Sequence, residues 1–295
     1  MKLRKVFTFY FLLFVFSSIF AWCKKSVPFM KKFWGFLLVI VLMTSCGEYQ
    51  SLLKSNDYNL VYKKAIEYYN KGDYQRAMNL LDGVRSVFVG QAKAQNIAYY
   101  RAFCSYNMKD YQIASDLFKQ FIQTYPESSF AEECLYMMGF CDYKASPKPR
   151  LDQQVTEKAI REFQLYLSRY PYSMRKDKVN TYMDEMRDKL SYKAYLSAKN
   201  YYLREHYKAA VISLQNCLKD YPGSKYREEI MYMLFVSKYQ MAVNSVEDKK
   251  VERYNNAREE YYYFADEYPN SRYAADVKKM HEDIEAYLEN YKFED

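Results

Sequence analysis

The sequence predicts an all-α protein built from repeated pairs of antiparallel helices. Three observations support this fold class: only seven glycines and seven prolines in 295 residues, apolar residues at helical spacing without strand alternation, and a recurring Tyr-Pro motif. The motif occurs as "YPESS", "YPYS", "YPGS" and "YPNS", and each of its prolines follows an alanine by 12 residues. A fixed spacing of this kind indicates a stack of similar units.

The alanine and proline of each copy have a helical explanation. A small side chain lets two antiparallel helices cross closely, and about three turns later a proline removes a backbone donor and stops the helix. Tyr74 and Ala77 begin a further copy, in which Val89 occupies the proline position. The complete pairs are Ala114 with Pro126, Ala159 with Pro171, Ala210 with Pro222, and Ala257 with Pro269.

These spacings resemble the tetratricopeptide repeat, a helix-turn-helix unit with small residues at positions 8 and 20 and a proline at position 32. When the alanines of three copies are placed at position 20, position 8 is again an alanine in each: Ala65, Ala102 and Ala198. Gly139 takes position 8 in the third copy, where an insert of about eight residues, "SPKPRLDQ", lengthens the turn. A comparable insert lies around residues 244–250.

The expected helices follow in chain order as five pairs and a closing helix. They span residues 58–70 with 74–87, 94–107 with 111–125, 131–144 with 155–170, 176–204 with 207–221, 226–242 with 251–268, and finally 272–291. The charged last helix gives the stack the polar end that it needs. Because no linker rich in Gly, Pro or Ser divides these helices, we expect one superhelical repeat domain over residues 58–295.

Residues 30–45 have the pattern of a lipoprotein signal peptide. Two lysines precede an apolar run from Phe33 to Met43, which is too short for a bilayer span of about 20 residues. The following Met-Thr-Ser-Cys resembles the lipobox of bacterial lipoproteins, in which the cysteine is acylated after cleavage. We therefore predict lipid attachment at Cys46 and a lipidated tether over residues 46–57. The alternative is a signal anchor with an incidental cysteine.

Residues 1–29 contain a second apolar run behind its own basic residues. We interpret this segment as an upstream extension, because a complete lipoprotein start begins at Met30; the alternative is a first membrane helix. The leader holds seven of the 44 basic residues and no acid, which leaves 37 basic against 36 acidic residues. The remaining chain therefore has no net basic charge that would favour nucleic acid as a partner.

Tyrosines recur at positions 5 and 12 of the first helices, two turns apart and hence on one face. Tyrosine combines a rigid apolar ring with a hydrogen-bonding hydroxyl, and asparagine amides pair with an extended backbone, so this face suits unfolded peptide. The alternative is that the same periodicity reflects packing between helices. The predicted client groove contains Tyr62, Tyr69, Asn70, Tyr99, Tyr106, Asn107, Tyr136 and Tyr143, and the possible partner-docking groove contains Tyr195 and Tyr202.

The lipobox, the repeats, "LYMMGFCDY" and the stretch from Tyr192 to Ser224 together resemble the BamD family, lipoproteins of the β-barrel assembly machinery. The resemblance implies a non-catalytic scaffold on the periplasmic face of the outer membrane. Its C-terminal repeats would dock on the POTRA domains of a BamA-like barrel subunit, and its N-terminal repeats would receive unfolded outer-membrane proteins. The longer fifth repeat and the extended leader depart from the family pattern.

Residues for catalysis or metal binding do not gather in the sequence. The two histidines, His206 and His281, are far apart, and a glycine-rich phosphate loop is absent, so we predict no enzyme activity and no cofactor or metal. We expect the pair Glu132-Glu133 on a solvated face. Cys104, Cys134, Cys141 and Cys217 are expected as buried free thiols. Two other functions remain open: a periplasmic lipoprotein that coordinates cell-wall or division machinery, and a hydrolase with an unrecognised site.

Overall fold

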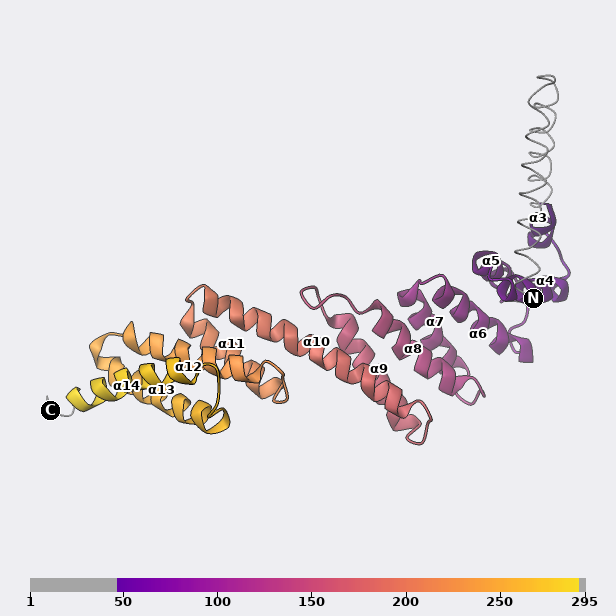
Figure 1. The fold of residues 1–295 in the computed structure, drawn as a ribbon. Helices are drawn as coiled ribbons and strands as arrows, with labels where there is room; N and C mark the ends of the chain where they lie inside the picture. The colour runs from indigo at the N-terminus through magenta and orange to yellow at the C-terminus, as the bar shows by residue number, and fades with distance from the viewer. Residues whose placement is uncertain (1–46, 292–295) are drawn as a thin grey trace, which may run out of the picture. The chain divides into compact units, whose positions relative to one another are not determined.

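The computed structural model describes residues 47–291, which form two compact units, one ending at Ala94 and the other beginning at Gln95 (Figure 1). Within the described range there are twelve α-helices and no strand, so the all-α prediction of repeated helix pairs is confirmed. The helices are α3 (Gly47–Leu53), α4 (Tyr58–Asn70), α5 (Tyr74–Val84), α6 (Ala92–Asn107), α7 (Tyr111–Thr124), α8 (Ala131–Ala145), α9 (Gln154–Arg169), α10 (Lys176–Leu203), α11 (Tyr207–Asp220), α12 (Arg227–Val243), α13 (Glu247–Glu267) and α14 (Ala274–Tyr291).

The first unit contains the pair α4 and α5, which begin in the same way. Asp57 and Asp73 are the N-caps, and each carboxylate accepts a hydrogen bond from a backbone N–H in the first turn of its helix. Gly72, between the helices, has φ of +83°, a conformation that costs glycine little. Helix α3, in the predicted tether, packs on α5, where Asn79 donates a hydrogen bond to the Tyr49 hydroxyl at 3.0 Å.

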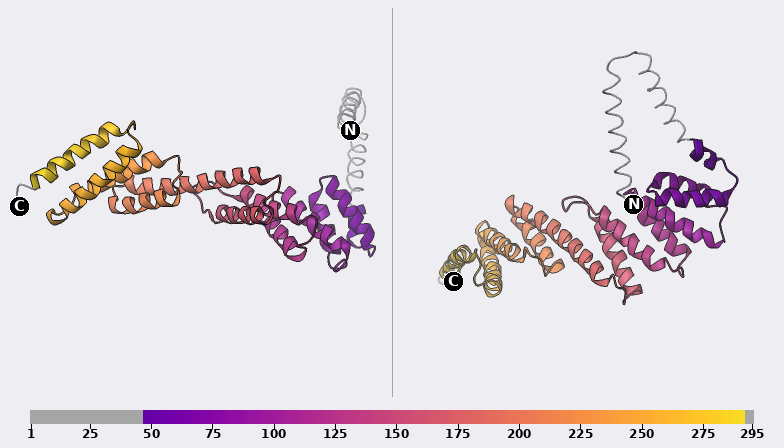
Figure 2. Two further views of the ribbon diagram at one scale, coloured as in Figure 1. Left: turned by 90° about the horizontal axis from the view of Figure 1, so that it is seen from below. Right: turned by 45° about the vertical axis from the view of Figure 1, so that its right-hand side comes forward.

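In the second unit each first helix packs against the second helix of its own repeat. The pairs are α6 with α7, α8 with α9, α10 with α11, and α12 with α13, followed by α14 (Figures 1 and 2). Helix α8 also packs on α7, α12 on α11, and α14 on α13, so each repeat covers the apolar face of the one before it. This nearest-neighbour packing is typical of repeat proteins.

The Tyr-Pro motifs end the second helices as predicted. Tyr125, Tyr170, Tyr221 and Tyr268 are the C-caps of α7, α9, α11 and α13, with φ between −127° and −132° and ψ between +60° and +66°. A following proline excludes the helical conformation from the residue before it, which explains why all four share this geometry. The tyrosine N–H still donates to the carbonyl oxygen four residues back, so the last turn is closed.

The serine of each motif joins neighbouring elements. In all four motifs its hydroxyl oxygen accepts the N–H two residues later, near the start of the next helix, at 3.0–3.3 Å. In three of them the same hydroxyl also forms a hydrogen bond with the first helix of the repeat that it closes: Ser173 with Glu132 at 2.7 Å, Ser224 with Ser191 at 2.8 Å, and Ser271 with Glu228 at 2.6 Å.

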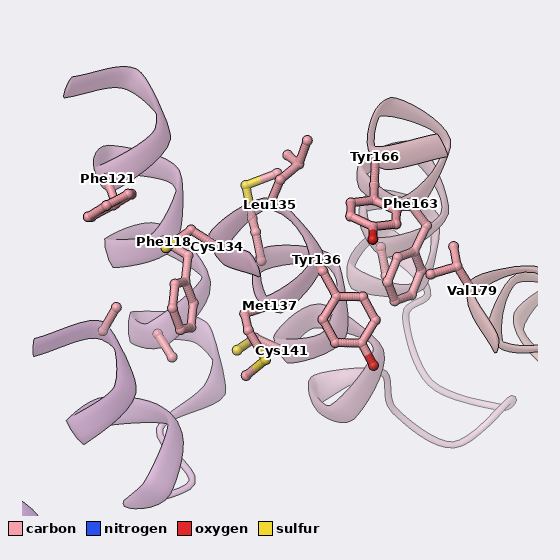
Figure 3. Close-up of a cluster of buried hydrophobic side chains, with 14 of the residues drawn as sticks. Phe118, Phe121, Cys134, Leu135, Tyr136, Met137, Cys141, Phe163, Tyr166 and Val179 are labelled. Carbon is pink, nitrogen blue, oxygen red and sulfur yellow. The ribbon is translucent and has the colours of Figure 1, made fainter. Parts of the chain in front are cut away.

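The core lies where the small residues predicted at the helix crossings meet aromatic rings. Ala102, Ala114 and Ala159 are fully buried, as are Phe118 and Phe163. Figure 3 shows the side chains of α8 between Phe118 and Phe121 on one side and Phe163 and Tyr166 on the other. Fully burying a phenylalanine side chain contributes about 1.5–3 kcal/mol, so these layers supply much of the stability of the second unit.

Helices α8 and α9 approach closely at Gly139, the only described glycine at which an added Cβ atom would meet other atoms within 4 Å. A Cβ atom added at Gly139 would lie 2.8 Å from Cδ1 of Phe163, well inside normal contact. Position 8 of this repeat therefore holds a glycine where other repeats hold an alanine. Over the range 47–291, none of the helices is both long and apolar enough to cross a bilayer.

Candidate functional site

The predicted lipid-attachment residue, Cys46, and the predicted signal peptide over residues 30–45 lie outside the described residues, as does the upstream extension. The described chain begins with α3 directly after Cys46. Lipid attachment therefore stays a prediction from the sequence.

In the first unit, the predicted groove residues Tyr62 and Tyr69 are half-buried and Asn70 is exposed. The ring of Tyr62 lies 6.1 Å from that of Phe88, and the ring of Tyr69 meets that of Tyr74 edge-on at 5.5 Å. Both rings thus leave part of their surface in solvent while neighbouring rings fix their orientation. A rigid ring of this kind can contact a ligand at little cost in side-chain entropy.

Tyr99 and Tyr106 on α6 are also half-buried and are packed among other aromatic rings. Tyr99 lies 4.6 Å from Phe130, measured between ring centroids, and its hydroxyl donates to Oε2 of Glu133 at 2.8 Å. Burial raises the pKa of Tyr106, so its hydroxyl stays protonated. The Asn107 amide donates to the backbone oxygen of Phe103 in its own helix at 2.8 Å.

On α8 the two predicted tyrosines differ in exposure. Tyr136 is only 7% exposed, and the guanidinium of Arg175 lies 4.7 Å from its ring centroid. Tyr143 is half-buried and donates a hydrogen bond to Glu185 on α10, which raises the pKa of Tyr143 to about 12. Of these two, therefore, Tyr143 presents the larger surface to a ligand.

The predicted docking tyrosines of α10 show the same contrast. Tyr195 is 5% exposed and stacks on Tyr226 with 4.4 Å between the ring centroids. Lys199 donates to the Tyr195 hydroxyl at 2.8 Å and to Glu229 at 2.7 Å. Tyr202 remains half-buried, and burial raises its pKa.

The sequence analysis did not predict hydrogen bonds from tyrosines to carboxylates of the following repeat. Tyr232 and Tyr239 on α12 donate to Asp276 and Asp283 on α14, at 2.6 and 3.2 Å, in the same way as Tyr143 donates to Glu185. Acidic residues recurring on the next first helix are the signal that could have revealed these pairs. Part of the tyrosine periodicity therefore serves packing between repeats.

The prediction that Glu132 and Glu133 lie on a solvated face is wrong for Glu132, whereas the side chain of Glu133 is 37% exposed. Oε1 of Glu132 accepts hydrogen bonds from the hydroxyls of Tyr166 and Ser173 at 3.0 and 2.7 Å, and Glu133 accepts one from Tyr99. Both side chains are partly buried because the closing motif of the repeat and the preceding first helix cover them.

A surface pocket of about 270 Å³ lies among α11, α12 and α13. Its wall combines two cations, Lys238 and Arg253, with amide and apolar side chains, namely Gln215, Asn256, Val211 and Met241. Lys238 is paired with Glu260 on α13, and Arg253 donates to the Ser245 hydroxyl at 2.6 Å. The pocket is thus a mixed polar and apolar hollow in the C-terminal repeats.

Exposed aromatic and apolar side chains that the sequence prediction did not single out lie elsewhere in the second unit. Tyr172 and Met174, in the turn between α9 and α10, are almost entirely exposed, and Tyr262 and Tyr263 on α13 are more than half exposed. These side chains add exposed apolar area outside the predicted grooves.

The described residues place no group of three His, Cys, Asp or Glu side chains where it could hold a metal ion. His281 stacks on Tyr261 with 3.8 Å between ring centroids, and burial lowers its pKa. Cys104 is buried, and Cys134, Cys141 and Cys217 are buried free thiols. Burial raises the pKa of Cys134 to about 12 and that of Cys217 to about 11, so neither thiol is an activated nucleophile.

Solved structures match the chain at low sequence identity and low TM-score. A tetratricopeptide-repeat protein from Bacteroides fragilis is 13% identical, with 79% of this chain and 100% of that chain covered and a TM-score of 0.39. The TPR2AB domain of yeast Sti1, in its complex with pHSP90, is 14% identical, with coverages of 77% and 98% and a TM-score of 0.35. Human IFIT1 is 17% identical, with coverages of 80% and 59% and a TM-score of 0.28.

No curated protein matches the chain. The model of the YfiO family, described as outer membrane lipoprotein, matches residues 54–229 and 193–294, and the two matches together cover every repeat. The chain therefore belongs to the YfiO family of outer membrane lipoproteins.

Proposed function

We propose that this protein is a non-catalytic subunit of the complex that assembles β-barrel proteins in the outer membrane, held at the periplasmic face by acyl chains on Cys46. The family match over residues 54–294 is the observation that carries this proposal.

The client-binding surface is formed separately in each unit by the tyrosines of the first helices. Their half-buried rings offer apolar area in a fixed orientation, and their hydroxyls and neighbouring amides can pair with an extended backbone. Tyr136 supports this surface from beneath, since it is buried. The proposed client residues are Tyr62, Tyr69 and Asn70 in the first unit, and Tyr99, Tyr106, Asn107, Tyr136 and Tyr143 in the second.

The C-terminal repeats are the proposed docking site for the POTRA domains of a BamA-like barrel subunit. Tyr202 is partly exposed there, and Tyr195 is fixed beneath the surface by Tyr226 and Lys199. The pocket between α11 and α13 adds a hollow into which a partner side chain could insert. Such a pocket is typical of the anchoring points of protein interfaces.

Site-specific photocrosslinking tests client binding. A photoreactive phenylalanine analogue at Tyr106 should crosslink to unfolded outer-membrane proteins in growing cells, whereas the same analogue at Gln164, exposed on the second helix α9, should not. Equal crosslinking at both positions, or none at Tyr106, would contradict the proposed surface.

Depletion of the protein distinguishes the proposed complex from cell-wall coordination. Loss of many outer-membrane barrels together supports the proposal, and division or wall defects with normal barrel levels would refute it. Mass spectrometry of the mature N-terminus tests the anchor: acylation at Cys46 is expected, and a Cys46→Ser variant should lose both the lipid and the membrane association.

A further inference from the structure

The inserted loop, residues 146–153 between α8 and α9, is held in one conformation by its own hydrogen bonds. Gln153 is only 3% exposed, and its Nε2 donates to the carbonyl oxygen of Lys148 at 2.8 Å. Thr156 donates to Oε1 of Gln153 at 2.7 Å, and the hydroxyls of Ser146 and Thr156 lie 2.6 Å apart. The loop is therefore ordered before any partner binds, which lowers the entropy cost of binding.

Two lysines of α10 reach this loop. Nζ of Lys189 donates to the Ser146 hydroxyl at 2.6 Å, and Nζ of Lys193 donates to the Leu151 carbonyl oxygen at 2.9 Å. The lysines are four residues apart, so they lie on one face of the helix. Each ammonium group uses one of its three protons on the loop in these contacts, which leaves donors for a further acceptor.

Four cations of this region lack an acidic partner. Lys148 and Arg150 are exposed on the loop, and none of the four, Lys189 and Lys193 included, forms an ion pair anywhere in the range 47–291. Some lysines elsewhere in the second unit are paired; Lys199, for example, lies 2.7 Å from a glutamate. The loop region thus holds four cations against two carboxylates, Asp152 and Glu185.

The carboxylates nearest in sequence are already engaged with other groups. Oδ1 of Asp152 accepts the backbone N–H of Gln154 at 2.9 Å, at the start of α9. Glu185, one turn before Lys189, accepts the Tyr143 hydroxyl. Both carboxylates keep their negative charge, and that of Glu185 acts on Lys189, but neither forms an ion pair with the four cations.

We infer that the inserted loop, together with Lys189 and Lys193, forms a docking surface for an acidic segment of a partner protein. Carboxylates spaced along an extended segment would meet cations presented by the loop and by one helix face, and such charge complementarity specifies a partner. Leu151, 58% exposed, is the only large hydrophobic side chain exposed on the loop. Because a bilayer surface is bound through apolar burial as well as charge, one leucine favours a protein segment over lipid.

Fluorescence anisotropy of a labelled peptide of alternating glutamate and serine, added to the full chain in non-ionic detergent, tests this surface. The matched neutral peptide contains glutamine in place of glutamate. Two variants remove cations from the surface: Lys148→Gln with Arg150→Gln, and Lys189→Gln with Lys193→Gln. The matched control is Lys208→Gln with Lys219→Gln, which removes the same charge from exposed lysines of α11.

The acidic peptide should bind and the neutral one should not. Each surface variant should weaken binding about 3- to 10-fold, from the usual strength of exposed charge pairs, and the control should change it less than about 2-fold. The Lys148 and Arg150 variant keeps the inference testable if loss of the α10 lysines loosens the loop. No binding of the acidic peptide, equal weakening in the control, or displacement of the peptide by phosphatidylglycerol but not by phosphatidylcholine micelles would overturn the inference.

Discussion

Substitution of Gly139 by alanine should destabilise the second unit although alanine favours helix formation. The new Cβ would lie 2.8 Å from Cδ1 and 3.0 Å from Cε1 of Phe163, whereas carbon atoms in contact normally lie about 3.5–4.0 Å apart. The ring would have to move by about 0.7 Å to restore that distance. Phe163 is fully buried and its ring packs 5.9 Å from that of Tyr182, so the movement disturbs further contacts.

Two opposing contributions, overpacking and helix propensity, set the change in the free energy of unfolding. Overpacking of a core costs about 1–3 kcal/mol, and replacing a helical glycine by alanine returns about 0.8–1 kcal/mol. The expected net loss is about 1 kcal/mol for Gly139→Ala, and more for Gly139→Val, whose branched side chain adds two further methyl groups against the same ring.

Urea unfolding followed by circular dichroism measures the effect. The urea midpoint should be highest for the wild type, lower for Gly139→Ala and lowest for Gly139→Val. The double variant Gly139→Ala with Phe163→Leu isolates the cause, because a smaller side chain at position 163 relieves the overlap. Its loss should be smaller than the sum of the two single losses. An alanine variant that is as stable as the wild type or more so would refute the reasoning.

Three further predictions follow from the second unit. Ser173→Ala should lower the melting temperature by about 2–4 °C, from a loss of about 1 kcal/mol, since Glu132 loses a hydrogen bond; Ser168→Ala, exposed on α9, is the control. Burial raises the pKa of Glu162 to about 8, so the folded state holds this proton more tightly than the unfolded chain. Stability should therefore fall as the pH rises from about 4.5 to 8. In Glu162→Gln, the contribution of this group to the fall in urea midpoint should be absent. Cys134 and Cys217 should resist iodoacetamide at neutral pH until urea unfolds the chain, as peptide mass spectrometry would show; modification of either in the native protein would contradict their burial.

Much of the fold could be predicted because its signals are local. Proline fixes the conformation of the residue before it, so the ends of α7, α9, α11 and α13 fall within one residue of the prediction. The end of α5 was predicted less accurately: this helix, which no proline follows, ends at Val84, three residues before the predicted end. Helix α3 was missed because it depends on packing against α5 through Tyr49, a contact that spacing does not reveal.

The predicted groove shows the limit of periodicity. The spacing of Tyr136 and Tyr143 placed both on one helix face, but the exposure of each ring depends on which side chains of the neighbouring repeat cover it. Arg175 lies over the ring of Tyr136, which is buried. Tyr143 stays half-buried although its ring stacks on that of Tyr182 at 4.5 Å and its hydroxyl donates to a carboxylate. Sequence reasoning found the positions, and the contact partners contributed by the next repeat decide which of them can touch a ligand.

The serine hydroxyls that close the repeats make the boundaries between them interchangeable. Ser173, Ser224 and Ser271 each satisfy one backbone group ahead and one side chain behind with the same short side chain. A genetic exchange at two such serines would delete or duplicate a whole unit and leave the hydrogen bonding at the junction intact. Lineages could therefore change the length of this scaffold in single steps, without first evolving a new junction.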